Sequence, residues 1–348
     1  MTTALRGLLL GCAVTAAVVS GRAAPVASSP EAGPRPRLEA WKAQFRRPAA
    51  VPYPEDNAYT PERERLGRSL FFDPRLSGSG WISCATCHNP GLSWADGLPL
   101  ALGDGMRSLP RRTPTILNLA WAPALLWDGR AESLEEQALG PIAAQGEMNL
   151  TLQELVLRLQ AIDGYRDLFA RAYPGAAISP EIVAKAIATF ERTIVSGVAP
   201  VDRWVAGEEG ALSPAAVRGF VVFNDKARCS TCHTGWRFTD DGFYDIGVAD
   251  SDIGRGAVLP RIPLARFAFK TPTLRNIAER APYMHNGSSP TLEDVIELYD
   301  RGGLAARASL SPEIKPLGLT PLEKHDLVAF LRTLTSHDPE ARVPALPR

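Results

Sequence analysis

A pentapeptide with two cysteines and a histidine occurs twice in the sequence. The first copy spans residues 84–88 (Cys-Ala-Thr-Cys-His) and the second spans residues 229–233 (Cys-Ser-Thr-Cys-His). Two cysteines three apart, followed directly by histidine, are the attachment signature of a c-type haem. The thiols form thioethers to the haem vinyl groups, and the histidine reaches the iron as its proximal ligand. The predicted haem-binding residues are Cys84, Cys87, His88, Cys229, Cys232 and His233.

Two other uses of paired cysteines have to be weighed against haem. A structural zinc site usually places its two Cys-x-x-Cys pairs about 15–20 residues apart, whereas these pairs lie 145 residues apart. A redox Cys-x-x-Cys motif needs no following histidine and lies near a βαβ pattern. Haem is the interpretation that explains both histidines, and we therefore predict two covalently bound c-type haems.

Composition and the N-terminus restrict the partners and the compartment. Lys+Arg and Asp+Glu both number 38 in 348 residues, and this balance gives no support for a nucleic-acid partner. Residues 1–24 are typical of a signal peptide, with Arg6, an apolar run and small residues before position 25. If this segment is removed, Cys12 leaves with it, and every remaining cysteine belongs to a haem motif. Because c-type haem is attached outside the bacterial cytoplasm, the sequence predicts a periplasmic protein.

The rest of the chain indicates an all-α fold with an internal duplication. Residues 25–57 are rich in Pro, Ala and Ser and predict a linker followed by an extended arm. Ser or Thr followed by Pro, as at Thr60, Ser179 and Ser213, predicts helix starts. The order of helix, haem motif, loops and closing helix occurs twice, and we place the boundary near residues 200–212.

Further motifs lie between and beside the haem motifs: Leu-Phe-Phe-Asp at 70–73, Trp-Asp-Gly-Arg at 127–130, Glu-Met at 147–148, Thr-Pro-Thr-Leu-Arg-Asn at 271–276 and Pro-Tyr-Met-His-Asn-Gly at 282–287. Together with both haem motifs, they resemble those of a known family, the bacterial diheme cytochrome c peroxidases and their MauG-type relatives. The resemblance runs from about Pro61 to Thr335. The resemblance implies two cytochrome c-like domains, each wrapped around one haem: residues 58–204 with the peroxide-binding haem and residues 205–348 with the electron-transfer haem.

The resemblance also assigns roles to four residues beside the haem ligands. Glu147 matches the distal-pocket glutamate that moves a proton between the two oxygens of peroxide as general base and then acid. Trp127 matches the tryptophan between the two haems, and Gln137 and Pro141 match neighbouring pocket positions. By residue type alone, Glu147 would be a solvated acid and Trp127 a core indole.

Two departures from the peroxidase pattern concern the sixth positions of the haem irons. Peroxidase members place a histidine in a Gly-His-Gly stretch, where this chain has Gly-Asp-Gly at 103–105. We therefore expect an open sixth position on the N-terminal haem. The other haem carries a methionine ligand in those members, fourteen residues after the position of His285, and this chain has Tyr299 there, as MauG-type members do. Tyr299 is the predicted ligand of that haem iron, Met284 a core residue and His285 a supporting group near the second haem.

Two more departures concern a protein partner and a metal ion. MauG-type enzymes oxidise tryptophans of a partner through a surface tryptophan two residues before the second haem motif, where this chain has Ala227. Trp236 follows the motif instead, and we expect it in the core. The family also holds a calcium ion between the haems, through an asparagine side chain and a backbone carbonyl. Arg112 stands at the asparagine position, and a guanidinium offers no oxygen to calcium. Arg280 stands where the family usually has a threonine that ligates by its backbone carbonyl, so Arg280 is less decisive. We expect calcium to be absent or weakly bound.

We therefore expect a periplasmic diheme peroxidase that reduces hydrogen peroxide with electrons from a small redox protein, a cytochrome c or a cupredoxin. One alternative is MauG-type oxidation of a protein partner by peroxide. The other is a diheme electron-transfer cytochrome without enzymatic activity. Glu147 and the missing distal histidine favour an enzyme, because a carrier would fill both sixth positions with strong ligands. The resemblance leaves a homodimer open.

Overall fold

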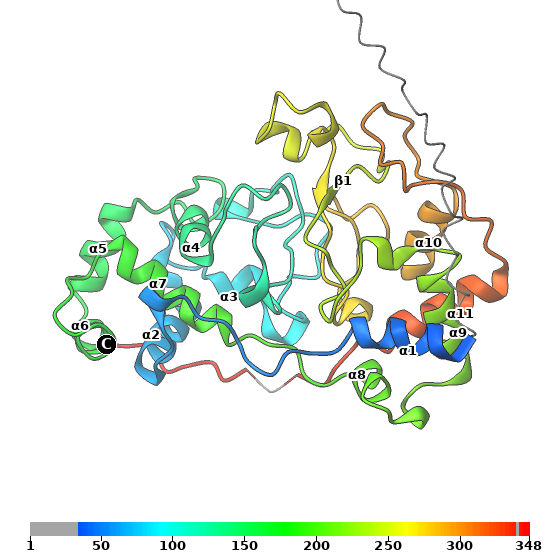
Figure 1. The fold of residues 1–348 in the computed structure, drawn as a ribbon. Helices are drawn as coiled ribbons and strands as arrows, with labels where there is room; N and C mark the ends of the chain where they lie inside the picture. The colour runs from blue at the N-terminus through cyan, green and yellow to red at the C-terminus, as the bar shows by residue number, and fades with distance from the viewer. Residues whose placement is uncertain (1–33, 339–340) are drawn as a thin grey trace, which may run out of the picture.

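The computed structural model describes residues 34–338 and 341–348 (Figure 1). Helices and loops make up almost all of these ranges, and the two strands, β1 (Phe243–Tyr244) and β2 (Phe269–Lys270), form one short antiparallel pair. The predicted all-α fold class is confirmed. The predicted signal peptide, residues 1–24, lies outside the described residues. Among the helices described, none is long and apolar enough to span a membrane.

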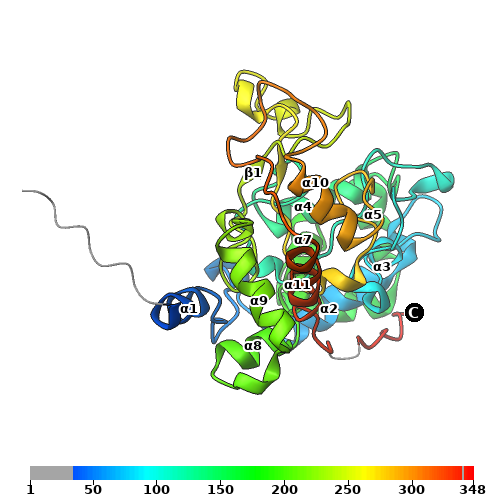
Figure 2. The same cartoon turned by 90° about the vertical axis from the view of Figure 1, so that its right-hand side faces the viewer.

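Each half of the molecule is built on one crossed helix pair. In the first half α2 (Pro61–Phe72) packs against α7 (Pro180–Arg192), and in the second half α9 (Pro214–Asn224) packs against α11 (Pro321–Arg332) (Figure 2). All four helices begin with a proline directly after a Ser or Thr N-cap, as the sequence predicts for α2, α7 and α9. The hydroxyl of each cap accepts a hydrogen bond from the backbone N–H three residues later.

Glycine allows the close crossing in both pairs. A Cβ on Gly67 of α2 would lie 1.9 Å from the carbonyl oxygen of Ala186 on α7. A Cβ on Gly219 of α9 would lie 1.9 Å from the carbonyl oxygen of Asp326 on α11. Phe71 and Phe223 each follow their glycine by four residues, so the two helices share a Gly-x-x-x-Phe pattern. This repeated pattern marks the same backbone-to-backbone contact in each half and supports the internal duplication.

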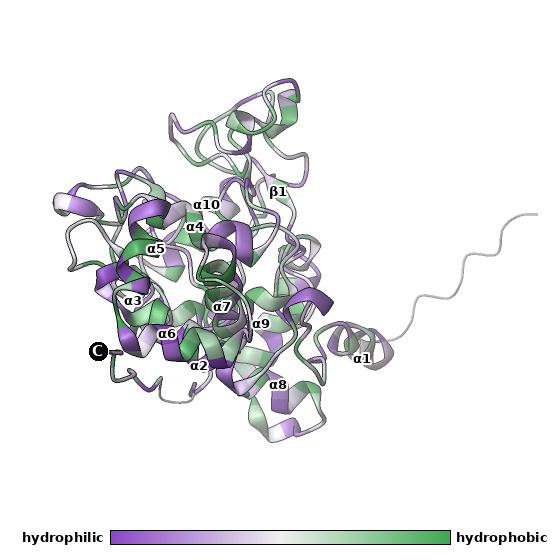
Figure 3. Ribbon diagram, turned by 90° about the vertical axis from the view of Figure 1, so that its left-hand side faces the viewer, coloured by the Kyte–Doolittle hydropathy of each residue, from purple (hydrophilic) through white to green (hydrophobic). Residues whose placement is uncertain are grey.

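The remaining elements surround these pairs. In the first half they are α3 (Cys84–Cys87), α4 (Leu134–Ala143), α5 (Leu152–Gln160) and α6 (Asp163–Ala172); in the second they are α8 (Pro200–Val205) and α10 (Leu292–Asp300). The apolar α7 lies in the middle of the first half (Figure 3). Its buried residues join those of α2, α5 and α6 in one core, while residues of α9 and α11 form the core of the second half.

The first and the last described segments, the helix of residues 34–44 and the tail of residues 341–348, lie on opposite halves (Figure 1). The extended arm predicted for residues 25–57 is wrong in part, because Pro34–Gln44 form the helix α1. Trp41 and Phe45 pack edge-on against Phe220 of α9, with ring centroids 6.5 and 5.6 Å away, and this apolar contact stabilises the helix on the second half.

The C-terminal tail runs in the other direction. The carbonyl oxygens of Pro347 and Arg348 accept hydrogen bonds from Arg75 Nη2 (2.9 Å) and from the backbone N–H of Gly164 (2.8 Å), both in the first half. The described tail, residues 341–348, therefore lies away from the C-terminal domain to which we assigned it. The domain boundary between residues 204 and 205 stays a prediction.

Candidate active site

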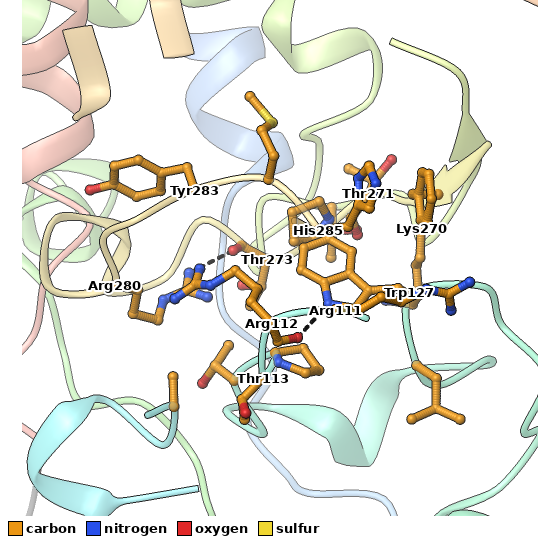
Figure 4. A pocket seen from close by; sticks show the side chains of 18 of the residues that line it. Arg111, Arg112, Thr113, Trp127, Lys270, Thr271, Thr273, Arg280, Tyr283 and His285 are labelled. Carbon is orange, nitrogen blue, oxygen red and sulfur yellow. Dashed lines mark hydrogen bonds between the residues drawn. The ribbon is translucent and has the colours of Figure 1, made fainter. Parts of the chain in front are cut away.

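A cavity of about 940 Å³ lies between the two halves and reaches both haem motifs. This volume is at the upper end of the range of about 300–1,000 Å³ that is usual for ligand pockets. Figure 4 shows part of its wall, where the loop around residues 111–113 faces the loop of residues 270–285. The cavity is lined by all eleven predicted site residues: Cys84, Cys87, His88, Trp127, Gln137, Pro141, Glu147, Cys229, Cys232, His233 and Tyr299.

The two motif histidines are oriented for binding iron. His88 Nδ1 lies 3.2 Å from the carbonyl oxygen of Trp94, and His233 Nδ1 lies 2.9 Å from that of Phe238. Because a carbonyl can only accept, Nδ1 carries the proton in both rings and Nε2 keeps a free lone pair. Burial lowers the pKa of both histidines, which favours the neutral, ligating form.

The rest of the cavity wall also fits haem. The four motif cysteines are not joined in disulfides and line the cavity, so each thiol is available for a thioether. Arg112 is buried in this wall, and its Nε and Nη2 have no hydrogen-bond partner in the part of the chain that the structure describes, as expected where an anionic group such as a haem propionate belongs. The residues present therefore match two c-type haems, one for each motif.

Glu147 is held in place by its backbone. α4 contains Pro141 and ends at Ala143, after which the chain turns so that the Glu147 N–H donates to the carbonyl oxygen of Ala144 (3.0 Å). The carbonyl of Glu147 accepts the N–H of Asp104 (2.8 Å). A Cβ on Gly103 would lie 1.7 Å from the carbonyl oxygen of Gly146. Only glycine fits at position 103, and the two loops are therefore locked together.

The carboxyl group of Glu147 is arranged for proton transfer. It makes no hydrogen bond or ion pair with the described residues. Burial raises the pKa of the Glu147 carboxyl above its ordinary value, and the charge of Arg130 opposes this rise. A raised pKa brings the carboxyl nearer to the operating pH, as general acid–base catalysis requires.

Asp104, at the position of the blocking histidine of peroxidase members, does not reach the cavity. Its Oδ2 accepts a hydrogen bond from Asn149 Nδ2 (2.8 Å) on the outside of the loop. The histidines that line the cavity are His88, His233 and His285. His285 Nε2 lies 3.0 Å from Asp250 Oδ2, and its ring stacks on Phe269. Among the described residues, the N-terminal side of the cavity thus presents no histidine opposite His88.

Trp127 bridges the two halves of the molecule. Its indole Nε1 donates to the carbonyl oxygen of Arg112 (2.9 Å), and its own carbonyl oxygen accepts the N–H of Lys270 on β2 (2.8 Å). Its ring meets that of His285 edge-on with centroids 6.3 Å apart. Gly129 has φ +67°, and a Cβ there would lie 2.2 Å from Phe243 Cζ, which explains the glycine of the Trp-Asp-Gly-Arg motif.

Tyr299 projects from α10 into the C-terminal side of the cavity. Burial raises the pKa of the Tyr299 phenol, and the neighbouring thiols of Cys229 and Cys232 add to the rise. These thiols place the tyrosine beside the second haem motif, as a ligand of that iron requires. Met284, which we expected in the core, is half-buried and also lines the cavity.

Two positions bear on contact with a protein partner. Ala227 is buried, with 7% of its surface exposed, so no redox-active side chain reaches the surface at that position. Trp236, expected in the core, is half-buried and packs edge-on against Trp121 with centroids 4.8 Å apart. Arg47 lies over its ring at 4.9 Å from the centroid.

Sequence reasoning missed Glu191 as a member of the cavity wall. This residue of α7 is 4% exposed, and no residue within 34–338 or 341–348 forms a hydrogen bond with its Oε2. Burial raises the pKa of Glu191 to about 8. A signal was present, because Glu191 follows Ile187 by one helical turn and therefore shares its apolar face. Its neighbour Arg192 pairs with Glu135 instead, with an N···O distance of 2.7 Å.

Comparisons with known proteins agree with this architecture. Residues 61–210 match the di-haem cytochrome c peroxidase family. Over 313 residues, 89% of this chain and 88% of the relative, the protein is 52% identical to the methylamine utilization protein MauG of Methylorubrum extorquens. It is 49% identical to the protein of the same name from Methylophilus methylotrophus, over 88% of this chain and 94% of the relative.

A peroxidase relative and a solved structure show the same relationship at lower identity. Cytochrome c551 peroxidase of Pseudomonas aeruginosa is 36% identical over 82% of each chain. The crystal structure of a MauG-like protein associated with microbial copper homeostasis has a TM-score of 0.77 and 33% identity, and the match covers 83% of this chain and 95% of that one. With its two c-type haem sites and its cavity, the chain is an oxidoreductase of the di-haem cytochrome c peroxidase and MauG family.

Proposed function

We propose that this protein uses hydrogen peroxide to oxidise a protein partner, as MauG-type enzymes do. This was the alternative to our first expectation, a peroxidase that takes electrons from a small redox protein. The observation that carries the proposal is the identity of 52% and 49% to two MauG proteins, against 36% to a cytochrome peroxidase. Tyr299 beside the second haem motif and the absence of a histidine opposite His88 support it from the cavity.

The two sides of the cavity have different roles in the proposed reaction. When bound, the haems would supply redox-active iron. Cys84, Cys87 and His88 would hold the haem at which peroxide reacts, and Cys229, Cys232, His233 and Tyr299 would hold the other. Glu147 takes the proton from the nearer oxygen of peroxide and returns it to the farther one, which leaves as water. Gln137 and Pro141 border this pocket and restrict where peroxide can lie.

Trp127 lies on the route between the two sides. Its indole N–H is held by a carbonyl oxygen, which cannot take a proton, so an electron can pass through Trp127 without proton loss. Over the whole reaction, peroxide takes up two electrons and two protons and gives two water molecules. In the proposed reaction both electrons come from tryptophan side chains of the partner protein. We also propose that the reaction takes place in the periplasm, as expected from residues 1–24.

The test compares two electron sources with the holoprotein. One equivalent of peroxide is added to ferric protein, and the spectrum is followed alone, with reduced cytochrome c, and with a candidate partner purified from cells grown on methylamine. We expect the oxidised protein to persist alone and to react faster with the partner, whose tryptophans then show mass changes by peptide mass spectrometry. Rapid steady-state turnover with reduced cytochrome c, without modification of the partner, would instead support the peroxidase expectation.

A further inference from the structure

Two arginine side chains lie next to each other in the cavity wall without a carboxylate partner. Arg112 and Arg280 are 6% and 5% exposed, and their guanidinium groups lie side by side in Figure 4. Neither forms an ion pair with any described residue. Arg280 Nη2 donates to the carbonyl oxygens of Thr273 (2.7 Å) and Arg275 (2.6 Å), while Arg112 Nε and Nη2 have no hydrogen-bond partner among the described residues.

This arrangement is unfavourable in the protein alone. Burial, together with the charge of Arg112, lowers the pKa of Arg280 to about 9. Burial lowers the pKa of Arg112 too, although the charge of Asp96 opposes this. A buried charge without a counter-ion costs several kcal/mol or more. The remaining buried arginine of this loop pair, Arg275, has a bidentate partner in Asp202, at 2.7 and 2.8 Å. The described residues therefore provide no counter-ion for Arg112 and Arg280, and we expect a bound anion to provide it.

The location of the pair identifies the anions. Arg112 follows Arg111 in the first half, Arg280 belongs to the loop of the second half, and both line the cavity that reaches the two haem motifs. Each haem carries propionate groups, so two bound haems would bring further carboxylates into this cavity. We propose that the guanidinium groups of Arg112 and Arg280 together carry a charge of +2 and bind one propionate of each haem. This pair of cations, called the dication below, occupies the place of a divalent metal ion between the two haems. This inference rests on the haems and not on the proposed protein partner.

The backbone of Arg112 connects this dication to the electron route. Its carbonyl oxygen accepts the indole N–H of Trp127, and its N–H donates to the carbonyl oxygen of His285 (2.8 Å). A propionate bound by the Arg112 side chain therefore also holds in place the backbone carbonyl that orients Trp127. The dication positions both haems relative to Trp127 without a metal ion.

The test uses the reduction potentials of both haems, measured by spectroelectrochemistry on Arg112→Gln and Arg280→Gln holoprotein. Removing a cation beside a propionate favours ferric iron, so both potentials should fall in each variant. Arg112→Lys, which keeps the charge, should restore them in part. Arg203→Gln is the control, because Arg203 is half-exposed and pairs with exposed Glu208. Unchanged potentials in both Gln variants, or a shift of only one haem, would overturn the proposal.

A second measurement does not depend on how well those variants fold. Elemental analysis of wild-type holoprotein should find no stoichiometric calcium, and a chelator should leave the spectra and potentials of both haems unchanged. The double variant Arg112→Asn/Arg280→Thr frees the carbonyl oxygens of Thr273 and Arg275 beside the propionates, an oxygen set suited to Ca²⁺. This variant should bind about one calcium by titration calorimetry. Stoichiometric calcium in the wild type, lost on chelation with a change in either haem, would refute the dication.

Discussion

Replacing Glu147 with Gln removes one proton acceptor and changes little else. The residue is held by backbone hydrogen bonds to Ala144 and Asp104, and its carboxyl group has no side-chain partner to lose. An amide of the same shape therefore leaves the loop intact but cannot take a proton from peroxide. The other carboxyl groups nearby offer no substitute, because Asp128 is paired with Arg111 at 2.6 Å and the raised pKa of Glu191 keeps it protonated at neutral pH.

General acid–base groups contribute about 10²- to 10⁴-fold to rates, and we expect a loss of that order. The assay is the stopped-flow rate of the spectral change when ferric holoprotein meets peroxide. In the wild type this rate should rise with pH through the raised pKa of Glu147, because the carboxylate is the active base, and Glu147→Gln should lack this dependence. The control is Glu154→Gln, on the exposed side of α5. A rate within a few-fold of wild type, with both haems bound, would refute the role of Glu147.

Three further changes test other parts of the site. Gly103→Ala puts a Cβ 1.7 Å from the carbonyl oxygen of Gly146, so the loop that carries Glu147 must move. We expect a slower reaction with peroxide and a lower melting temperature. The control is Gly140→Ala, because a Cβ at Gly140 would have no described atom within 4 Å. Burial raises the pKa of Glu191 to about 8, whereas the unfolded chain releases this proton near 4.5. The free energy of unfolding should therefore fall as pH rises from about 5 to 8, by at most about 1.4 kcal/mol per pH unit. Denaturant titrations at pH 6 and pH 8 should show this fall in wild type and a smaller one in Glu191→Gln; equal falls would contradict it. Tyr299→Met should raise the reduction potential of the C-terminal haem, because methionine ligation raises haem potentials; an unchanged spectrum and potential would show that Tyr299 is no ligand.

Features that depend on neighbours in the sequence could be predicted. Both haem motifs, the caps of α2, α7 and α9, and the repeated Gly-x-x-x-Phe pattern are local, and the structure gives each a physical reason. The family motifs identified the residues of one cavity, although their chemical roles stay predictions. α1 was missed because Pro, Ala and Ser dominate residues 25–57, while Leu38, Trp41 and Phe45 already follow helical spacing.

Features that depend on contacts between distant segments could not be predicted. Nothing near the C-terminus indicates that Pro347 and Arg348 contact the first half of the molecule. Arg112 and Arg280 are 168 residues apart, and only the folded chain shows that they share one buried place without a carboxylate. Glu191 could be assigned to the apolar face of its helix, but its unpaired oxygen follows from how α7 packs.

The central claim is that the haem bound by His88 has an open site for peroxide beside Glu147. EPR and electronic spectra of the resting ferric holoprotein, before and after one equivalent of peroxide, test it most directly. The account predicts one high-spin and one low-spin ferric haem, and an immediate reaction with peroxide without prior reduction. Two six-coordinate low-spin haems, inert to peroxide until one is reduced, would contradict it.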